Sequence, residues 1–250
     1  MKILGVESSG NVASVAIVED AILVGEYTIN NKKTHSQTLL PMIEQVLEMA
    51  GSTLEGFDAI ATSSGPGSFT GLRIGAATVK GLGLATGLPV VSVPTLEGLA
   101  YNLAGADALV CPMMDARRGQ VYTGLYRVAL HTLEQKLTAE DFQIVLPGKP
   151  MDIHEILEEI NRFSEKVIFL GDGVPVQKET IEKICKVPYH FAPPHMSRQR
   201  AGSVAVLGAL YYEQGKTETA AEHKPDYMRL SQAERELAEK KKGMAVIRDN

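Results

Sequence analysis

The chain has few residues that reinforce a fold covalently or with large aromatic side chains. Its 250 residues include no Trp, only two Cys and an aromatic content of 6%. Cys111 and Cys185 form no CxxC pair, so the sequence indicates no disulfide framework. We therefore expect a protein of a reducing, cytosolic compartment. Its hydrophobic content of 44% is ordinary for a globular protein and is sufficient for a buried core.

Long apolar runs and an excess of positive charge are also missing. No apolar run approaches the ~18 residues of a membrane span, and the opening MKILGVESS becomes polar too early for a signal peptide. The net charge is −5, whereas proteins that bind nucleic acid alone usually carry a basic footprint. Any contact with nucleic acid is therefore expected to be local or shared with a partner.

Short β-branched runs and helical spacings alternate along the chain. Strands are predicted at 2–8, 12–18, 22–29, 58–64, 89–93, 108–114, 119–127, near 142–146 and at 167–170. Helices are predicted at 36–50, 71–86, 95–104, 152–163, 175–185 and 202–214. Ser36 is the expected N-cap of the first helix and Gly51 its stop, while Pro41 is expected to delay or bend the first turn. Three strands followed by alternating helices and strands are typical of a ribonuclease H-like domain, and the second half loosely repeats this order.

Four strings of residues are more specific than the order of elements. Residues 65–75 read GPGSFTGLRIG, residues 115–122 read DARRGQVY, residues 224–229 read KPDYMR and residues 3–9 read ILGVESS. Together they resemble the signature strings of the TsaB (YeaZ) family, with Met228 for Leu in the third string. Glu7 and Ser8 stand where that family usually has Asp and Thr. The resemblance extends from residue 1 to about residue 236.

The resemblance implies the architecture in more detail. It implies an α/β fold of two ribonuclease H-like lobes of the actin/ASKHA type, with mixed sheets flanked by helices. Residues 1–104 would form the N-terminal lobe, joined by a returning helix at 202–214. Residues 105–201 would form the C-terminal lobe, and residues 215–250 a tail.

The resemblance also implies a function. TsaB proteins resemble TsaD, the subunit that transfers threonylcarbamoyl to adenosine 37 of tRNAs that read ANN codons. The chain would then be a non-catalytic partner of TsaD in a complex with the ATPase TsaE. It would form a homodimer when alone, contact tRNA only through the complex, stay off membranes and need no cofactor of its own.

The alternative is an enzyme, either an M22-type glycopeptidase or a small-molecule kinase. TsaD holds a metal through two His of a helix, and Thr95 and Leu99 stand at those positions here. Residues 197–205, where TsaD supplies an Asp ligand, contain no carboxylate. Neither a G-x-S-x-G elbow nor a D-x-G-x-T phosphate motif occurs. These differences favour a degenerate paralogue without catalytic or metal-binding residues.

The helix at 71–86 contains several glycines, each of which costs ~1 kcal/mol relative to Ala inside a helix. Close backbone approach would offset that cost, either to the protein's own sheet or to a second subunit. The family pairs through its first two helices, and Met42 and Met49 lie off the apolar stripe of the first one, so we expect the interface here. The candidate interface residues are Leu39, Leu40, Met42, Ile43, Val46, Leu47, Leu72, Gly75, Thr78, Val79 and Leu82.

Two charged segments remain open to interpretation. Arg117 and Arg118 are candidates for binding an anion, and a solvated hairpin turn is the alternative. Residues 231–242 read as a charged surface helix, in which Lys240–Lys242 give limited support to an RNA-binding module.

Overall fold

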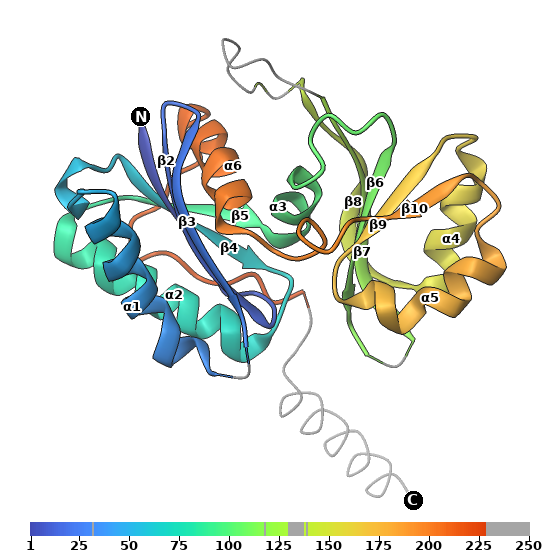
Figure 1. Ribbon diagram of the computed structural model, residues 1–250, viewed down its shortest axis with the longest axis horizontal. Helices are drawn as coiled ribbons and strands as arrows, with labels where there is room; N and C mark the ends of the chain where they lie inside the picture. Colours follow the sequence, from blue (N-terminus) through green and yellow to red (C-terminus); the bar gives the residue numbers. More distant parts are fainter. Residues whose placement is uncertain (32, 118, 130–137, 139, 229–250) are drawn as a thin grey trace, which may run out of the picture.

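The computed structural model describes residues 1–31, 33–117, 119–129, 138 and 140–228. These residues form two five-stranded mixed sheets with flanking helices, which confirms the predicted fold class (Figure 1). No helix among them is long and apolar enough to cross a membrane. The predicted tail helix at 231–242 and Arg118 lie outside the described residues.

The first sheet has the strand order β3-β2-β1-β4-β5. β1 (Lys2–Glu7), β2 (Val12–Glu19) and β3 (Ile22–Asn30) form an antiparallel meander. β4 (Ala59–Gly65) and β5 (Val90–Pro94) continue the sheet in parallel with β1. The short 3-10 helix η1 (Leu54–Gly56) precedes β4.

The second sheet repeats this order as β8-β7-β6-β9-β10. β6 (Leu109–Asp115), β7 (Gln120–Val128) and β8 (Phe142–Asp152) form its meander. β9 (Val167–Leu170) and β10 (Tyr189–Phe191) run parallel to β6. α4 (Ile153–Arg162) and α5 (Gly173–Ile184) pack against each other beside this sheet. The sequence did not predict β10, because it was read as part of a Pro-rich loop.

α1 (His35–Met49) and α2 (Phe69–Thr86) cover one face of the first sheet (Figure 1). The N-cap of α1 is Thr34, so the prediction of Ser36 is wrong by two residues, and Pro41 lies inside the helix without delaying its start. Gly51 ends α1 as predicted, with φ +59° and its N–H bonded to Glu48.

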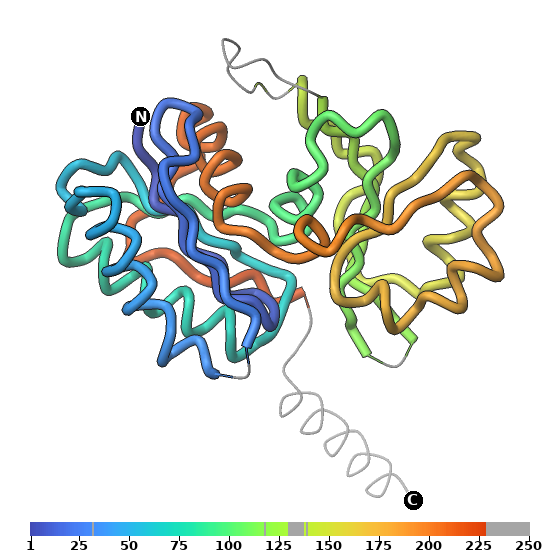
Figure 2. The backbone as a smooth tube through the Cα atoms, viewed as in Figure 1, coloured from blue at the N-terminus to red at the C-terminus, as the bar shows by residue number. Residues whose placement is uncertain are grey.

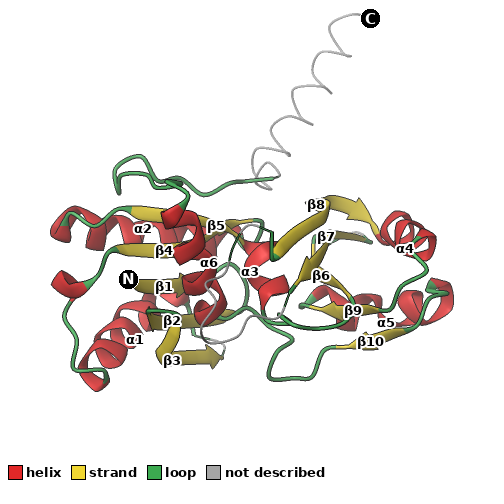
Figure 3. Ribbon diagram, turned by 90° about the horizontal axis from the view of Figure 1, so that it is seen from above, coloured by secondary structure: helices red, strands yellow, loops and turns green. Residues whose placement is uncertain are grey.

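α3 (Thr95–Tyr101) and α6 (Ala201–Glu213) lie between the two sheets (Figure 3). α6 follows the last strand of the second sheet, but it packs on β1, β2 and β4 of the first, as the chain trace in Figure 2 shows. α3 follows the first sheet and contacts β6 and β7 of the second. Because each helix crosses to the other lobe, one hydrophobic core joins them, with Ile3, Leu99, Val110 and Val204 among its members.

Candidate functional site at the cleft and on the first two helices

A cleft of about 540 Å³ opens between the lobes. On the first lobe it is lined by the β1–β2 turn, the start of α2 and the segment before Met228. On the second lobe it is lined by the β6–β7 turn and Asp172, which precedes α5. All four family strings therefore meet at this cleft, although they are far apart in the sequence.

The buried side chain of Glu7, at the end of β1, holds the β1–β2 turn through hydrogen bonds. Its carboxylate Oε1 accepts hydrogen bonds from the backbone N–H and the hydroxyl of Ser9, both at 2.6 Å. Burial raises the pKa of the Glu7 carboxyl above its usual range, and the hydrogen bonds from Ser9 oppose this effect. The longer acid at the family's Asp position thus serves to shape the turn.

The β1–β2 turn packs directly against the start of α2. In a phosphate-binding protein, this space would be left open for the anion. The Ser68 N–H donates to the Ser9 carbonyl at 2.6 Å, and the Ser8 hydroxyl donates to the Gly71 carbonyl at 2.9 Å. A Cβ at Gly67 or Gly71 would overlap the backbone oxygen of Ser9 or Ser8. The Gly71 N–H bonds to the Ser68 side chain, so the helix start is occupied by the protein's own groups.

The opposite wall of the cleft carries charges of both signs. Arg117 is exposed with φ +63°, and its N–H donates to the Asp115 carboxylate at 2.8 Å. The Asp172 carboxylate accepts the Asp115 N–H at 3.2 Å, and burial raises the pKa of Asp172. The backbone N–H of Arg117 is therefore bound to an acidic side chain, and anion binding by Arg117 stays a prediction.

The two positions that correspond to metal ligands in TsaD are buried in α3. Thr95 and Leu99 are each 1% exposed, and Leu99 belongs to the core between the lobes. Within the described part of the chain, no three His, Cys, Asp or Glu side chains group as metal ligands would. The neighbouring Glu97 accepts a hydrogen bond from the Tyr211 hydroxyl, and burial raises the pKa of this carboxyl.

Most of the predicted interface residues lie in the core of their own lobe. The buried ones are Leu39, Met42, Ile43, Val46, Leu72, Gly75 and Val79, while Leu47, Thr78 and Leu82 are half-buried. Of the residues predicted, Leu40 alone is largely exposed, at 53%. A Cβ at Gly75 would overlap the Ser8 hydroxyl, so this glycine serves close approach to the protein's own β1–β2 turn, and its assignment to an intermolecular contact is corrected.

Gly81 of α2 has no close neighbour among the described residues of its own lobe that would require a glycine. Nothing lies within 4 Å of a Cβ built at Gly81, whereas a Cβ built at Gly83 would lie 2.7 Å from the Cβ of Ala220. Gly81 is exposed, and so is Leu84 at 67%. Neither residue is among the predicted interface residues, although Ala77, Gly81 and Leu84 follow the helical spacing of one exposed face.

The KPDYMR string belongs to a segment, residues 218–228, that runs along the first lobe and is called the strap below. The backbone of Glu218 pairs with Val90 of β5, and His223 Nδ1 lies 2.8 Å from the Glu218 carboxylate and 3.2 Å from the Ser92 hydroxyl. Lys80 of α2 donates to the Ala221 and His223 carbonyls. These contacts fix α2 against the sheet edge.

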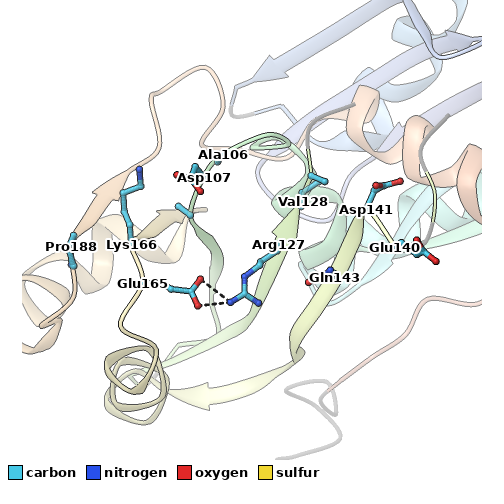
Figure 4. Close-up of a pocket in the computed structure, with 12 residues that line it drawn as sticks. Ala106, Asp107, Arg127, Val128, Glu140, Asp141, Gln143, Glu165, Lys166 and Pro188 are labelled. Atoms are coloured by element: carbon cyan, nitrogen blue, oxygen red, sulfur yellow. Dashed lines mark hydrogen bonds and ion pairs between the residues drawn. The ribbon is translucent and has the colours of Figure 1, made fainter. Parts of the chain in front are cut away.

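A second hollow, of about 640 Å³, lies at the end of the second sheet where β6 and β9 begin (Figure 4). Arg127 of β7 forms an ion pair with Glu165 across it, at 2.7 Å, and both side chains are substantially exposed. Asp107, Asp141 and Lys166 add further charges of mixed sign around it. This hollow is remote from the family strings and lacks a buried polar group aimed into it among the residues the structure places.

The comparisons with known proteins agree with the strings that line the cleft. The model of the TsaD family, tRNA N6-adenosine threonylcarbamoyltransferase, matches residues 23–237. The tRNA threonylcarbamoyladenosine biosynthesis protein TsaB of Bacillus subtilis is 32% identical over 97% of this chain and 100% of its own length. TsaB of Escherichia coli is 32% identical over 64% of this chain and 68% of its own.

Solved structures give the same result. YeaZ from Pseudomonas aeruginosa matches with a TM-score of 0.72 at 25% identity, over 90% of this chain and 99% of that one. A second P. aeruginosa structure, described as similar to peptidase YEAZ, matches with a TM-score of 0.75 at 25% identity, over 91% of this chain and 99% of that one. The chain therefore belongs to the TsaB (YeaZ) family of tRNA threonylcarbamoyladenosine biosynthesis proteins.

Proposed function

We propose that the chain is a non-catalytic subunit that binds TsaD and is required for threonylcarbamoylation of adenosine 37 in tRNAs reading ANN codons. It acts in the cytoplasm, joins TsaD and the ATPase TsaE, forms a homodimer when alone, and needs no cofactor. Its role is to stabilise the active form of TsaD through a protein surface.

The observation that carries this proposal is Gly81. This residue costs α2 ~1 kcal/mol relative to Ala, yet no part of the described chain approaches it. A partner's backbone passing close to α2 would explain the cost. The surface around it, called the helix face below, consists of small and apolar side chains: Leu40 and Leu47 of α1, and Ala77, Gly81, Leu84 and Ala85 of α2.

The alternative of a metallopeptidase or kinase is less well supported. Thr95 and Leu99 offer a hydroxyl and an isobutyl group where an i, i+4 His pair would be needed for chelation. The packed β1–β2 turn already occupies the start of α2, which is the part of the cleft that a phosphate would use.

Reconstitution tests the proposal directly. TsaD, TsaE and a source of threonylcarbamoyl-adenylate are incubated with tRNA, with and without this chain, and modified adenosine is measured. We expect modification to depend on the chain. Full modification without it, or peptide hydrolysis or ATP turnover by the isolated chain that a point variant abolishes, would refute the proposal.

A further inference from the structure

An apolar groove separate from the helix face lies between β3 and α1. It has a volume of about 330 Å³ and is lined by Val24 and Tyr27 of β3 and by Val46 and Met49 of α1, among others. Met49 is 81% exposed, and Val24 and Tyr27 are more than 40% exposed. The groove therefore offers apolar surface that the described residues leave in contact with water.

The backbone beside the groove is equally open. β3 is the last strand in the order of the first sheet. One of its edges pairs with β2, and the other edge has no neighbouring strand among the described elements. A long edge strand with exposed apolar side chains readily accepts another extended segment.

The charge around the groove is negative. α1 and β3 contain Glu26, Glu44 and Glu48 and no Lys or Arg. Glu26 is already engaged by Arg200, whereas Glu44 and Glu48 are exposed on α1, with Glu48 next to Met49. An apolar segment flanked by positive charge would therefore complement this site.

The chain contains such a segment after its described part. Residues 240–248 read KKKGMAVIR, four consecutive apolar residues between three Lys and one Arg. We infer that Met244–Ile247 bind in the β3–α1 groove of the same molecule, adding an antiparallel strand to the edge of β3, with Lys240–Lys242 toward Glu44 and Arg248 toward Glu48.

The geometry permits this path. Met228 and Asn11 both line the cleft, and Val12, next to Asn11, pairs with Asn30 at the end of β3. The groove lies three to six residues back along β3, about 10–20 Å from Asn30 at ~3.3 Å per residue. Residues 229–240 can span up to about 40 Å when extended, and about 18 Å as the helix predicted from the sequence, so either conformation reaches the groove. A chain that enters from the Asn30 end would run antiparallel to β3, which a strand can pair with directly.

Cysteine crosslinking in the full-length chain tests this inference. In a Cys185→Ser background, Val24→Cys is combined with Val246→Cys, and the matched control combines Val176→Cys, an exposed position on α5 outside the helix face, with the same Val246→Cys. Oxidised glutathione accepts the two electrons as the pair of thiols becomes a disulfide. We expect an intramolecular disulfide at Val24 that forms at least about tenfold faster than at Val176. The disulfide at Val24 should form more slowly when Lys240–Lys242 are changed to Glu.

Three results would overturn the inference. Equal rates at the two positions would show that the segment has no preferred site. A faster rate at Val176 would place the segment on the second lobe. A covalent dimer as the main product at Val24 would show that the groove takes the segment of a second copy.

Discussion

Gly75 and Gly81 lie on the same helix, and we predict that the same substitution has opposite effects on stability at the two sites. At Gly75 even a Cβ would overlap the Ser8 hydroxyl, which is held by the Gly71 carbonyl. An Arg there must also place a charged side chain between α2 and the β1–β2 turn. Overpacking and burial of an unpaired charge together should cost about 3 kcal/mol or more, against a total stability of about 5–15 kcal/mol.

At Gly81 the added side chain enters open space. In the monomer, Gly81→Arg should therefore gain most of the ~1 kcal/mol that glycine costs a helix, so the variants and the parent are compared at a concentration that keeps all of them monomeric. For a chain of this size the melting temperature should rise by about 2–4 °C, whereas Gly75→Arg should lower it by about 6 °C or more. Thermal unfolding followed by circular dichroism measures both changes. A Gly75→Arg variant as stable as the parent would refute the packing described for α2.

Three further predictions concern other parts of the structure. Burial raises the pKa of the Glu97 carboxyl in the folded chain, so the folded chain binds a proton there more tightly and the parent should lose stability as the pH rises above about 4.5. Glu97→Gln should make the free energy of unfolding, measured by urea titration from pH 5 to 8, less dependent on pH. An unchanged dependence would count against a buried carboxyl. His223→Ala removes two hydrogen-bond contacts of the strap and should cost about 1–3 kcal/mol, with faster hydrogen exchange at Glu218 and Val90; unaltered exchange there would contradict the strapping role. Elemental analysis of the purified chain should find no stoichiometric zinc or iron, and metal that is lost on changing Thr95 would contradict the assignment of α3.

The strand and helix order was predictable because periodicity and turn residues act locally. The meander at 2–30, the stop at Gly51 and the helix at 71–86 all follow from such local signals. β10 was not predictable, because three residues beside a Pro-rich stretch form a strand only when β9 offers a parallel edge. Tertiary contact overrides local preference at such places.

The sequence was sufficient to predict which segments form the candidate site, but not which side of each helix its residues face. Glycine content indicated close approach on α2, but only the three-dimensional structure shows that Gly75 faces Ser8 while Gly81 faces outward. Likewise, the apolar stripe of α1 indicated a buried face, and its residues were assigned to an interface that their burial places inside the lobe. A one-dimensional pattern cannot tell a core from an interface, since both select apolar and small residues.

The most direct test of the central claim compares Gly81→Arg with Gly56→Arg. Both glycines are exposed, and nothing lies within 4 Å of a Cβ at either, but Gly56 is in η1, outside the helix face. Binding to TsaD and modification of tRNA are measured for both variants. We predict that Gly81→Arg stays folded yet binds TsaD over a hundredfold more weakly, a loss of ~3 kcal/mol, and fails to support modification, while Gly56→Arg behaves like the parent. Parent-like binding and modification with Gly81→Arg would contradict the account.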